Sequence, residues 1–188
     1  MPRPQRHAPA GVTNHVIQRG NNRQLCFLSE TDFRTYLYWL AHYAAEYHVD
    51  IHAWVLMPNH VHLMCTPQTT DALSKLMQSL GRKYVRYFNF THQRTGTLWE
   101  GRFKSWPVLT NDYLWQLFRY IELNPVRAGI TSNALDYPWS SHRFNAFGTP
   151  CNLGAPHTLF LASPTPANVS IRNTGIYSHW DSVMQSLI

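Results

Sequence analysis

The fold of this chain is decided by the segment Ile51–Cys65, which reads Ile-His-Ala-Trp-Val-Leu-Met-Pro-Asn-His-Val-His-Leu-Met-Cys. Its first half is rich in β-branched and aromatic residues, and a second short apolar run begins at His60. Pro58-Asn59 between the two runs favours a turn, so the segment predicts a hairpin with a tight polar corner. Because successive side chains of a strand point to opposite faces, His60 and His62 should lie together on one face.

Two histidines separated by one residue on a strand can share a cation, since neutral imidazole is a common metal ligand. A His-x-His pair is also often structural, with its rings held by hydrogen bonds. Two ligands do not make a metal site. The pair therefore needs a third group from elsewhere in the chain.

Composition is compatible with a nucleic-acid partner. The 188 residues include 16 Lys and Arg against 10 Asp and Glu, a formal charge of +6, together with 7 Trp, 10 Tyr and 9 Phe. Cations neutralise phosphates, and aromatic faces stack on unpaired bases. A modestly basic enzyme without a nucleic-acid partner has a similar composition. The length suits one main domain with its own core.

The cysteines and the apolar runs indicate the compartment. Cys26, Cys65 and Cys151 are widely spaced and include no Cys-x-x-Cys pair, which argues against a disulfide framework and favours the reducing cytosol. No apolar run approaches the ~20 residues of a membrane span, and Met1–Arg6 lacks the apolar segment of a signal peptide. We expect a cytoplasmic protein that does not associate with membranes.

The other elements are predicted from apolar periodicity and from turn and capping residues. Strands are expected at residues 11–18 and 101–109 and helices at residues 31–48 and 72–90. Pro107 implies that the last strand lies at a sheet edge or a bulge. The order βαββαβ favours an α+β fold with a ferredoxin-like antiparallel sheet, its helices on one face and the opposite face open for a site.

A further helix, added after this unit, begins at Thr110-Asn111-Asp112 and is expected to stop at Pro125. Gln116, Tyr120 and Asn124 fall at i, i+4 and i+8 and so share one face of this helix. A residue before proline is pushed away from helical geometry, so of these three residues Asn124 fits the shared helical face least well.

Tyr120 brings chemistry to the histidine pair. With a pKa near ~10, a phenol is a poor nucleophile unless a cation or base lowers the cost of ionising it. A divalent ion held by His60, His62 and the Asn124 carbonyl would keep open positions for phosphate oxygens, and Tyr120 could then attack phosphorus in line. The alternative is that Tyr120 is a core aromatic with its hydroxyl at the surface.

Several motifs, in this order, resemble those of a known family. His60-Val-His62 resembles the His-hydrophobe-His motif of the HUH single-stranded DNA endonucleases. Tyr120–Gly129 and Trp99–Lys104 look like the REP-associated tyrosine transposases, a single-tyrosine branch of insertion-sequence transposase-like enzymes. The resemblance covers about residues 11–148 and also includes the segments His15–Asn21 and Tyr137–Ser141.

The resemblance implies that residues 1–148 form a catalytic domain that cuts one DNA strand near a hairpin. It maps the nucleophile to Tyr120 and the metal ligands to His60, His62 and Asn124. Cleavage would leave a 5′-phosphotyrosine and a free 3′-hydroxyl, which can attack that link and rejoin strands, so no nucleotide cofactor is required. The implied ion is magnesium or manganese, and two imidazoles with an amide oxygen suit manganese better.

The implied partner is single-stranded DNA with REP-like hairpins, and the family analogy favours a monomer over the dimers of related transposases. The candidate DNA contacts are cationic side chains from several elements: Arg19, Arg23, Arg82, Lys83, Arg86, Arg102, Lys104 and Arg127. Residues 149–188 are rich in Pro, Ser, Thr and Asn and match no motif, so they form a C-terminal tail of unknown role.

Two other functions compete with this interpretation. A non-catalytic hairpin-binding protein descended from such an enzyme would keep the basic surface but show no cleavage. The presence of both histidines, Tyr120 and Asn124 argues against it. A histidine-rich nucleotide hydrolase would turn over small nucleotides, but the chain has only two clustered histidines.

Overall fold

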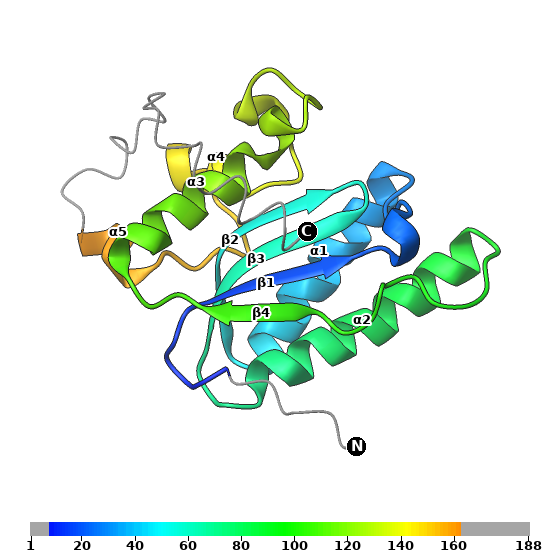
Figure 1. Ribbon diagram of the computed structural model, residues 1–188, viewed down its shortest axis with the longest axis horizontal. Helices are drawn as coiled ribbons and strands as arrows, with labels where there is room; N and C mark the ends of the chain where they lie inside the picture. The colour runs from blue at the N-terminus through cyan, green and yellow to red at the C-terminus, as the bar shows by residue number, and fades with distance from the viewer. Residues whose placement is uncertain (1–7, 163–188) are drawn as a thin grey trace.

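The computed structural model describes residues 8–162, which are built around a four-stranded antiparallel sheet (Figure 1). In chain order the elements are β1 (Asn14–Arg19), the 3-10 helix η1 (Asn21–Arg23), α1 (Glu30–Glu46), β2 (Val49–Met57), β3 (His60–Pro67), α2 (Ala72–Thr91), β4 (Lys104–Pro107), α3 (Asn111–Arg127), the 3-10 helix η2 (Ala134–Asp136), α4 (His142–Phe147) and α5 (Thr158–Ala162). The strand order is β2-β3-β1-β4, and each neighbouring pair is antiparallel. The predicted α+β class is confirmed.

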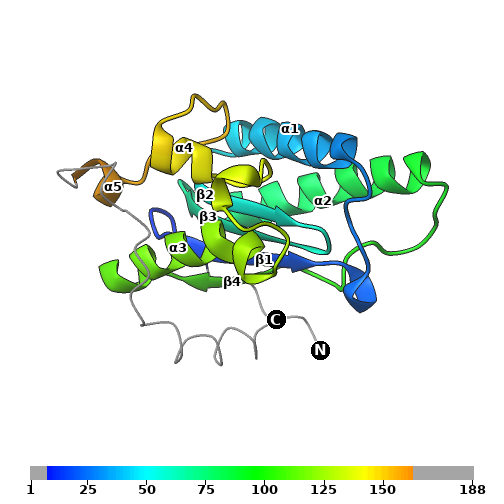
Figure 2. The ribbon, with the colours of Figure 1, turned by 90° about the horizontal axis from the view of Figure 1, so that it is seen from above.

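The first face of the sheet packs against α1 and α2 (Figure 2). A capping box starts α1, in which the Ser29 side chain accepts from the Asp32 N–H and the Asp32 carboxylate accepts from the Ser29 N–H. The apolar stripe of α2, which includes Leu76 and Leu80, is buried against the sheet together with Leu63 of β3. This layer is the main hydrophobic core.

The second face of the sheet is partly covered by α3, which lies on the opposite side from α1 and α2 (Figure 2). Leu117 and Ile121 of α3 pack against Val55 and Met57 of β2. The expectation that this face is open is therefore wrong over β2. The physical reason is that β2 is apolar on both faces, and an apolar face has to be covered by another element.

Pro125 does not stop α3, contrary to the prediction from the sequence. The helix runs on to Arg127 and ends where Gly129 adopts a positive φ of 67°. A proline so close to the end removes only one helical hydrogen bond, and the backbone N–H groups of the following residues still find helical carbonyls, as Ala128 does at Asn124. Asn124 consequently stays inside the helix, one turn after Tyr120.

The free edge of β2 is covered by a segment that follows α3. The Leu56 N–H donates to the Trp139 carbonyl at 2.9 Å, and the Ala155 N–H donates to the Ile51 carbonyl at 2.8 Å. Such cover satisfies an edge strand that would otherwise expose unpaired backbone groups. The beginning of the predicted tail thus lies against the sheet, whereas residues 163–188 of that tail lie outside the described residues. Within residues 8–162, no helix is long and apolar enough to cross a membrane.

Candidate active site

The histidine pair lies on the second face of the sheet. His62 of β3 stands between Ile17 of β1 and Val55 of β2, and His60 stands opposite Arg19. The centroids of the two imidazole rings are 5.0 Å apart and the rings are nearly perpendicular. His62 is fully buried and His60 is half-buried. The hairpin therefore presents both rings at one place, as the alternation of the strand predicts.

Each ring is held through Nδ1. The His60 Nδ1 donates to the Asn59 Oδ1 at 2.6 Å, and the His62 Nδ1 lies 3.0 Å from the His15 Nε2. The Nε2 atoms of His60 and His62 are both buried and have no hydrogen-bond partner among residues 8–162. Buried polar atoms normally have a hydrogen-bond partner, and a metal-binding histidine usually donates a hydrogen bond from its other ring N–H to a neighbouring group. The two free Nε2 atoms therefore fit a bound cation.

The histidines are neutral at physiological pH because they are buried. Burial lowers the pKa of His60 to about 4, and the charge of Arg19 contributes in the same direction. Burial likewise lowers the pKa of His15 to about 3 and holds the pKa of His62 well below its usual range. A neutral imidazole keeps a lone pair, which a metal ligand requires.

Tyr120 lies beside this pair. Its ring centroid is 5.2 Å from that of His62 and 6.2 Å from that of His15, with the rings edge to face in both cases. The Arg127 guanidinium lies 5.6 Å from the centre of the tyrosine ring. Tyr120 is half-buried and also packs at the border of the α3 core. The structure thus brings together the phenol and the two histidines that the sequence singles out.

Asn124, the predicted third ligand, occupies the next turn of α3, where its side chain is buried. Within residues 8–162, no group of three histidine, cysteine or carboxylate side chains is placed to hold a metal ion. A third protein ligand beside the two imidazole nitrogens would therefore have to be of another kind, and the oxygen of an amide side chain is such a ligand. The ligand role of Asn124 stays a prediction.

The candidate DNA contacts are divided between two faces of the molecule. Arg19 and Lys104 point to the histidine face by strand register, and Arg127 lies over Tyr120. The remaining cations lie on η1, on the exposed side of α2 and in the loop before β4: Arg23, Arg82, Lys83, Arg86 and Arg102. The eight candidate cations therefore do not share a single surface.

A buried carboxylate fixes the helix that carries Tyr120. Glu122 accepts hydrogen bonds from the Ser141 hydroxyl at 2.9 Å, the Asn145 amide at 2.7 Å and the His142 Nδ1 at 3.0 Å. These partners come from the segment that covers β2, so the network joins α3 to the edge of the sheet. Sequence reasoning missed both Glu122 and His15.

The missed residues carry different signals. His15 lies on the strand predicted at residues 11–18, but the observed β1 runs on to Arg19, and only its pairing with β3 brings His15 to the histidine face, which is not visible in the sequence. Glu122 is a lone acid among apolar helix positions, which is compatible with either a buried or an exposed side chain.

The fold and the site together define an α+β protein with two histidines and a tyrosine at one sheet face. Residues 10–124 match the family described as IS200-like transposases, and the chain belongs to this family.

One curated protein and one solved structure are similar to this chain. The REP-associated tyrosine transposase of Escherichia coli (strain K12) is 32% identical over 101 residues, which are 53% of this chain and 58% of that protein. The match therefore spans little more than half of the relative's length. A solved structure of a REP-associated tyrosine transposase bound to a REP hairpin is similar in fold, with a TM-score of 0.62 at 23% identity over 84% of this chain and 93% of that one.

Proposed function

We propose that this protein is a metal-dependent single-stranded DNA endonuclease and strand transferase that acts near DNA hairpins. The observation that carries the proposal is the placement of the Tyr120 ring 5.2 Å from His62, beside two buried Nε2 atoms without a partner. Membership of a transposase family supports DNA as the substrate, and the similar protein bound to a REP hairpin supports a hairpin partner. The strand order β2-β3-β1-β4 supports a ferredoxin-like arrangement.

A magnesium or manganese ion would supply Lewis acidity at the phosphate that is cut. His60 and His62 would hold it through Nε2, and the Asn124 amide oxygen would be the third ligand. Imidazole nitrogens suit manganese better than magnesium, which prefers oxygen.

Tyr120 is the proposed nucleophile. Its phenolic oxygen forms a bond to phosphorus, the bond from phosphorus to the 3′-oxygen breaks, and the phenolic proton leaves while the 3′-oxygen gains one. The products are a 5′-phosphotyrosine and a free 3′-hydroxyl, and the reverse reaction rejoins strands. The positive charge of Arg127, over the tyrosine ring, favours the negative charge that develops on the phenolic oxygen.

The proposal is tested by incubating the protein with manganese and a labelled single-stranded hairpin. Wild type should form an adduct that resists denaturation, and Tyr120→Phe should lose essentially all of it, because positioning cannot replace a missing nucleophile. Tyr113→Phe in the same helix is the matched control and should keep the adduct. An adduct of wild-type yield in Tyr120→Phe would disprove the assignment, and hairpin binding without any adduct in wild type would indicate a non-catalytic binding protein.

A further inference from the structure

The turn of the histidine hairpin is held by the loop that follows β1. The Gly20 N–H donates to the Asn59 carbonyl at 2.8 Å, and the Cys26 N–H donates to the Pro58 carbonyl at 2.8 Å. The Asn59 side chain makes a third contact, because its Nδ2 donates to the Arg23 carbonyl at 3.3 Å. Two of these three contacts join backbone atoms, so the shape of the turn does not depend on the side chain at position 59.

Backbone geometry does not require asparagine at this position either. Asparagine is favoured where φ is positive, but Asn59 is not among the residues of the described part of the chain, 8–162, that have a positive φ. Its backbone would therefore accept many other side chains. What distinguishes the Asn59 side chain is the contact of its Oδ1 with the Nδ1 of His60, at 2.6 Å.

The chemistry of the amide fixes the direction of this contact. The Arg23 carbonyl can only accept, so the Nδ2 side of the amide faces it and the Oδ1 side faces His60. An amide oxygen also can only accept, so the His60 proton is on Nδ1 and the Nε2 keeps its lone pair. The partner of His62 is the His15 ring, which can donate or accept. Of the two hairpin histidines, His60 is thus the one whose neighbour alone determines the tautomer.

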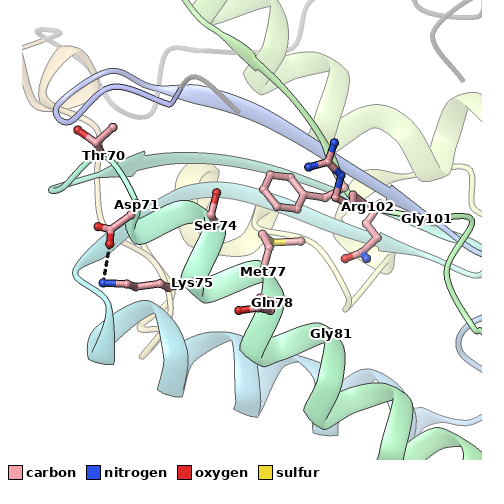
Figure 3. A pocket seen from close by; sticks show the side chains of 11 residues that line it. Thr70, Asp71, Ser74, Lys75, Met77, Gln78, Gly81, Gly101 and Arg102 are labelled. Atoms are coloured by element: carbon pink, nitrogen blue, oxygen red, sulfur yellow. Dashed lines mark ion pairs between the residues drawn. The ribbon is translucent and has the colours of Figure 1, made fainter. Parts of the chain in front are cut away.

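Arg19, the cross-strand neighbour of His60, cannot replace Asn59 as this acceptor. Arg19 stands opposite His60 on the histidine face, whereas the preceding residue, Gln18, lines the groove between α2 and the segment 101–103 on the other face of the sheet (Figure 3). A guanidinium has donors and no acceptor. Arg19 therefore cannot hold a proton on the His60 Nδ1, and Asn59 does.

We propose that Asn59 is a positioning residue of the candidate active site, which holds the His60 proton on Nδ1 and thereby presents a bare Nε2 to the cation. The proposal rests on the proposed function for the presence of that cation. The other tautomer would place the proton on Nε2 and block the lone pair that a metal requires. Groups that hold metal-bound histidines in this way typically contribute about 10- to 100-fold to metal affinity.

Two variants of similar size separate the acceptor from the rest of the side chain. Asn59→Leu removes the acceptor, whereas Asn59→Asp keeps one whichever way its carboxylate turns. Nitrogen NMR of the histidines in the metal-free protein, at about pH 8 where an ordinary imidazole is neutral, reports the tautomer directly. The His60 proton should be on Nδ1 in wild type and Asn59→Asp, and should move at least partly to Nε2 in Asn59→Leu.

Manganese affinity, measured by electron paramagnetic resonance, is the second readout. It should be about 10- to 100-fold weaker in Asn59→Leu and at or above the wild-type value in Asn59→Asp. Asn133→Leu is the matched control, because Asn133 is exposed and its Oδ1 accepts from the Leu135 N–H within its own loop. It should change neither the tautomer nor the affinity. Asn59→Leu should fold, since the backbone contacts of the turn remain, and the wild-type tautomer tests the proposal without any variant.

The outcomes separate the role of Asn59 from the proposed function. A His60 proton on Nε2 in wild type would overturn the role of Asn59, as would wild-type manganese affinity in Asn59→Leu. In both cases wild type would still bind manganese and form the Tyr120 adduct, so the proposed function would stand. A wild-type protein that binds no manganese would overturn the metal-dependent function and the role of Asn59 with it.

Discussion

The His15 Nε2 lies 3.0 Å from the His62 Nδ1, within the buried part of the histidine face. The two rings are stacked, with centroids 5.3 Å apart. If His62 binds a cation through Nε2, as proposed, its proton has to be on Nδ1, so that His62 donates and His15 accepts. We therefore propose His15 as a positioning residue that selects the tautomer of His62 and the direction of its ring.

Replacing His15 should weaken metal binding before it affects anything else. We expect His15→Phe to lower the affinity for manganese about 10- to 100-fold, the usual effect of losing the partner of a metal-bound histidine. His15→Gln keeps an acceptor and should recover part of the affinity. Electron paramagnetic resonance of bound manganese measures both variants, and His42→Phe on α1 is the control. Equal affinity in His15→Phe and wild type would contradict the positioning role.

The Glu122 network should be a major contributor to stability. Glu122→Ala leaves the Ser141, His142 and Asn145 donors without their shared buried acceptor, so we expect a loss of about 3–5 kcal/mol in the free energy of unfolding. Chemical denaturation measures this loss. Glu30→Ala removes an exposed ion pair with Arg34 and should cost under about 1 kcal/mol. Similar losses in the two variants would show that the network contributes no more than a surface ion pair.

The contrast between local and non-local information explains what the sequence could predict. Strand alternation placed His60 and His62 together, and helical spacing placed Tyr120 and Asn124 one turn apart, because both periodicities are local. The role of His15 depends on the pairing of β1 with β3, between residues 47 positions apart. Cover of the second face by α3 likewise depends on tertiary packing, which no local pattern encodes.

Some local rules also failed because context outweighed them. A proline stops a helix where several further helical hydrogen bonds would have to form after it. Because α3 ends at Arg127, shortly after Pro125, few such bonds are needed. In the loop after β1, Gly20 is required because a side chain there would collide with the Gln24 carbonyl oxygen. The chain forms η1 directly after this close approach, and Asn22 and Arg23 adopt positive φ angles there.

The Asp32 carboxylate should make the free energy of unfolding depend on pH in the acid range. Burial alone would raise the pKa of its carboxyl, but hydrogen bonds from the Leu28 and Ser29 N–H groups and from the His92 and Tyr87 side chains outweigh this and lower the pKa. A group whose folded pKa lies below its unfolded value, about 3.9 for aspartate, stabilises the protein above that pH. The contribution disappears as the pH falls through the folded pKa.

The variant Asp32→Asn isolates this effect. It should be less stable than wild type at pH 7, and its free energy of unfolding should depend less on pH below about pH 5. Urea melts over the acid range measure both quantities. Asp136→Asn, at an exposed position in η2, should follow the wild-type curve. A parallel acid dependence in Asp32→Asn would show that this carboxylate does not contribute.

The cations on the two faces should differ in how they affect the salt dependence of hairpin binding. Each phosphate that a cation neutralises adds roughly 0.7–0.9 to the slope of log affinity against log salt. Reversing Arg82 and Lys83 to glutamate should flatten this slope by about that amount for each phosphate that the variant no longer neutralises. Lys83 lies 4.4 Å from the centre of the Trp39 ring, so part of its interaction is with α1. Arg82→Glu alone should therefore account for most of the change.

Lys104→Glu tests the histidine face in the same assay, because Lys104 stands opposite Ile17 on that side of the sheet. A flatter slope in both sets of variants would mean that the DNA touches α2 as well as the site. If only Lys104→Glu changes the slope, the α2 cations serve solubility and do not bind DNA. If neither does, hairpin affinity does not come from phosphate neutralisation by these side chains, and the remaining cations, Arg23 and Arg86 among them, are the next to reverse.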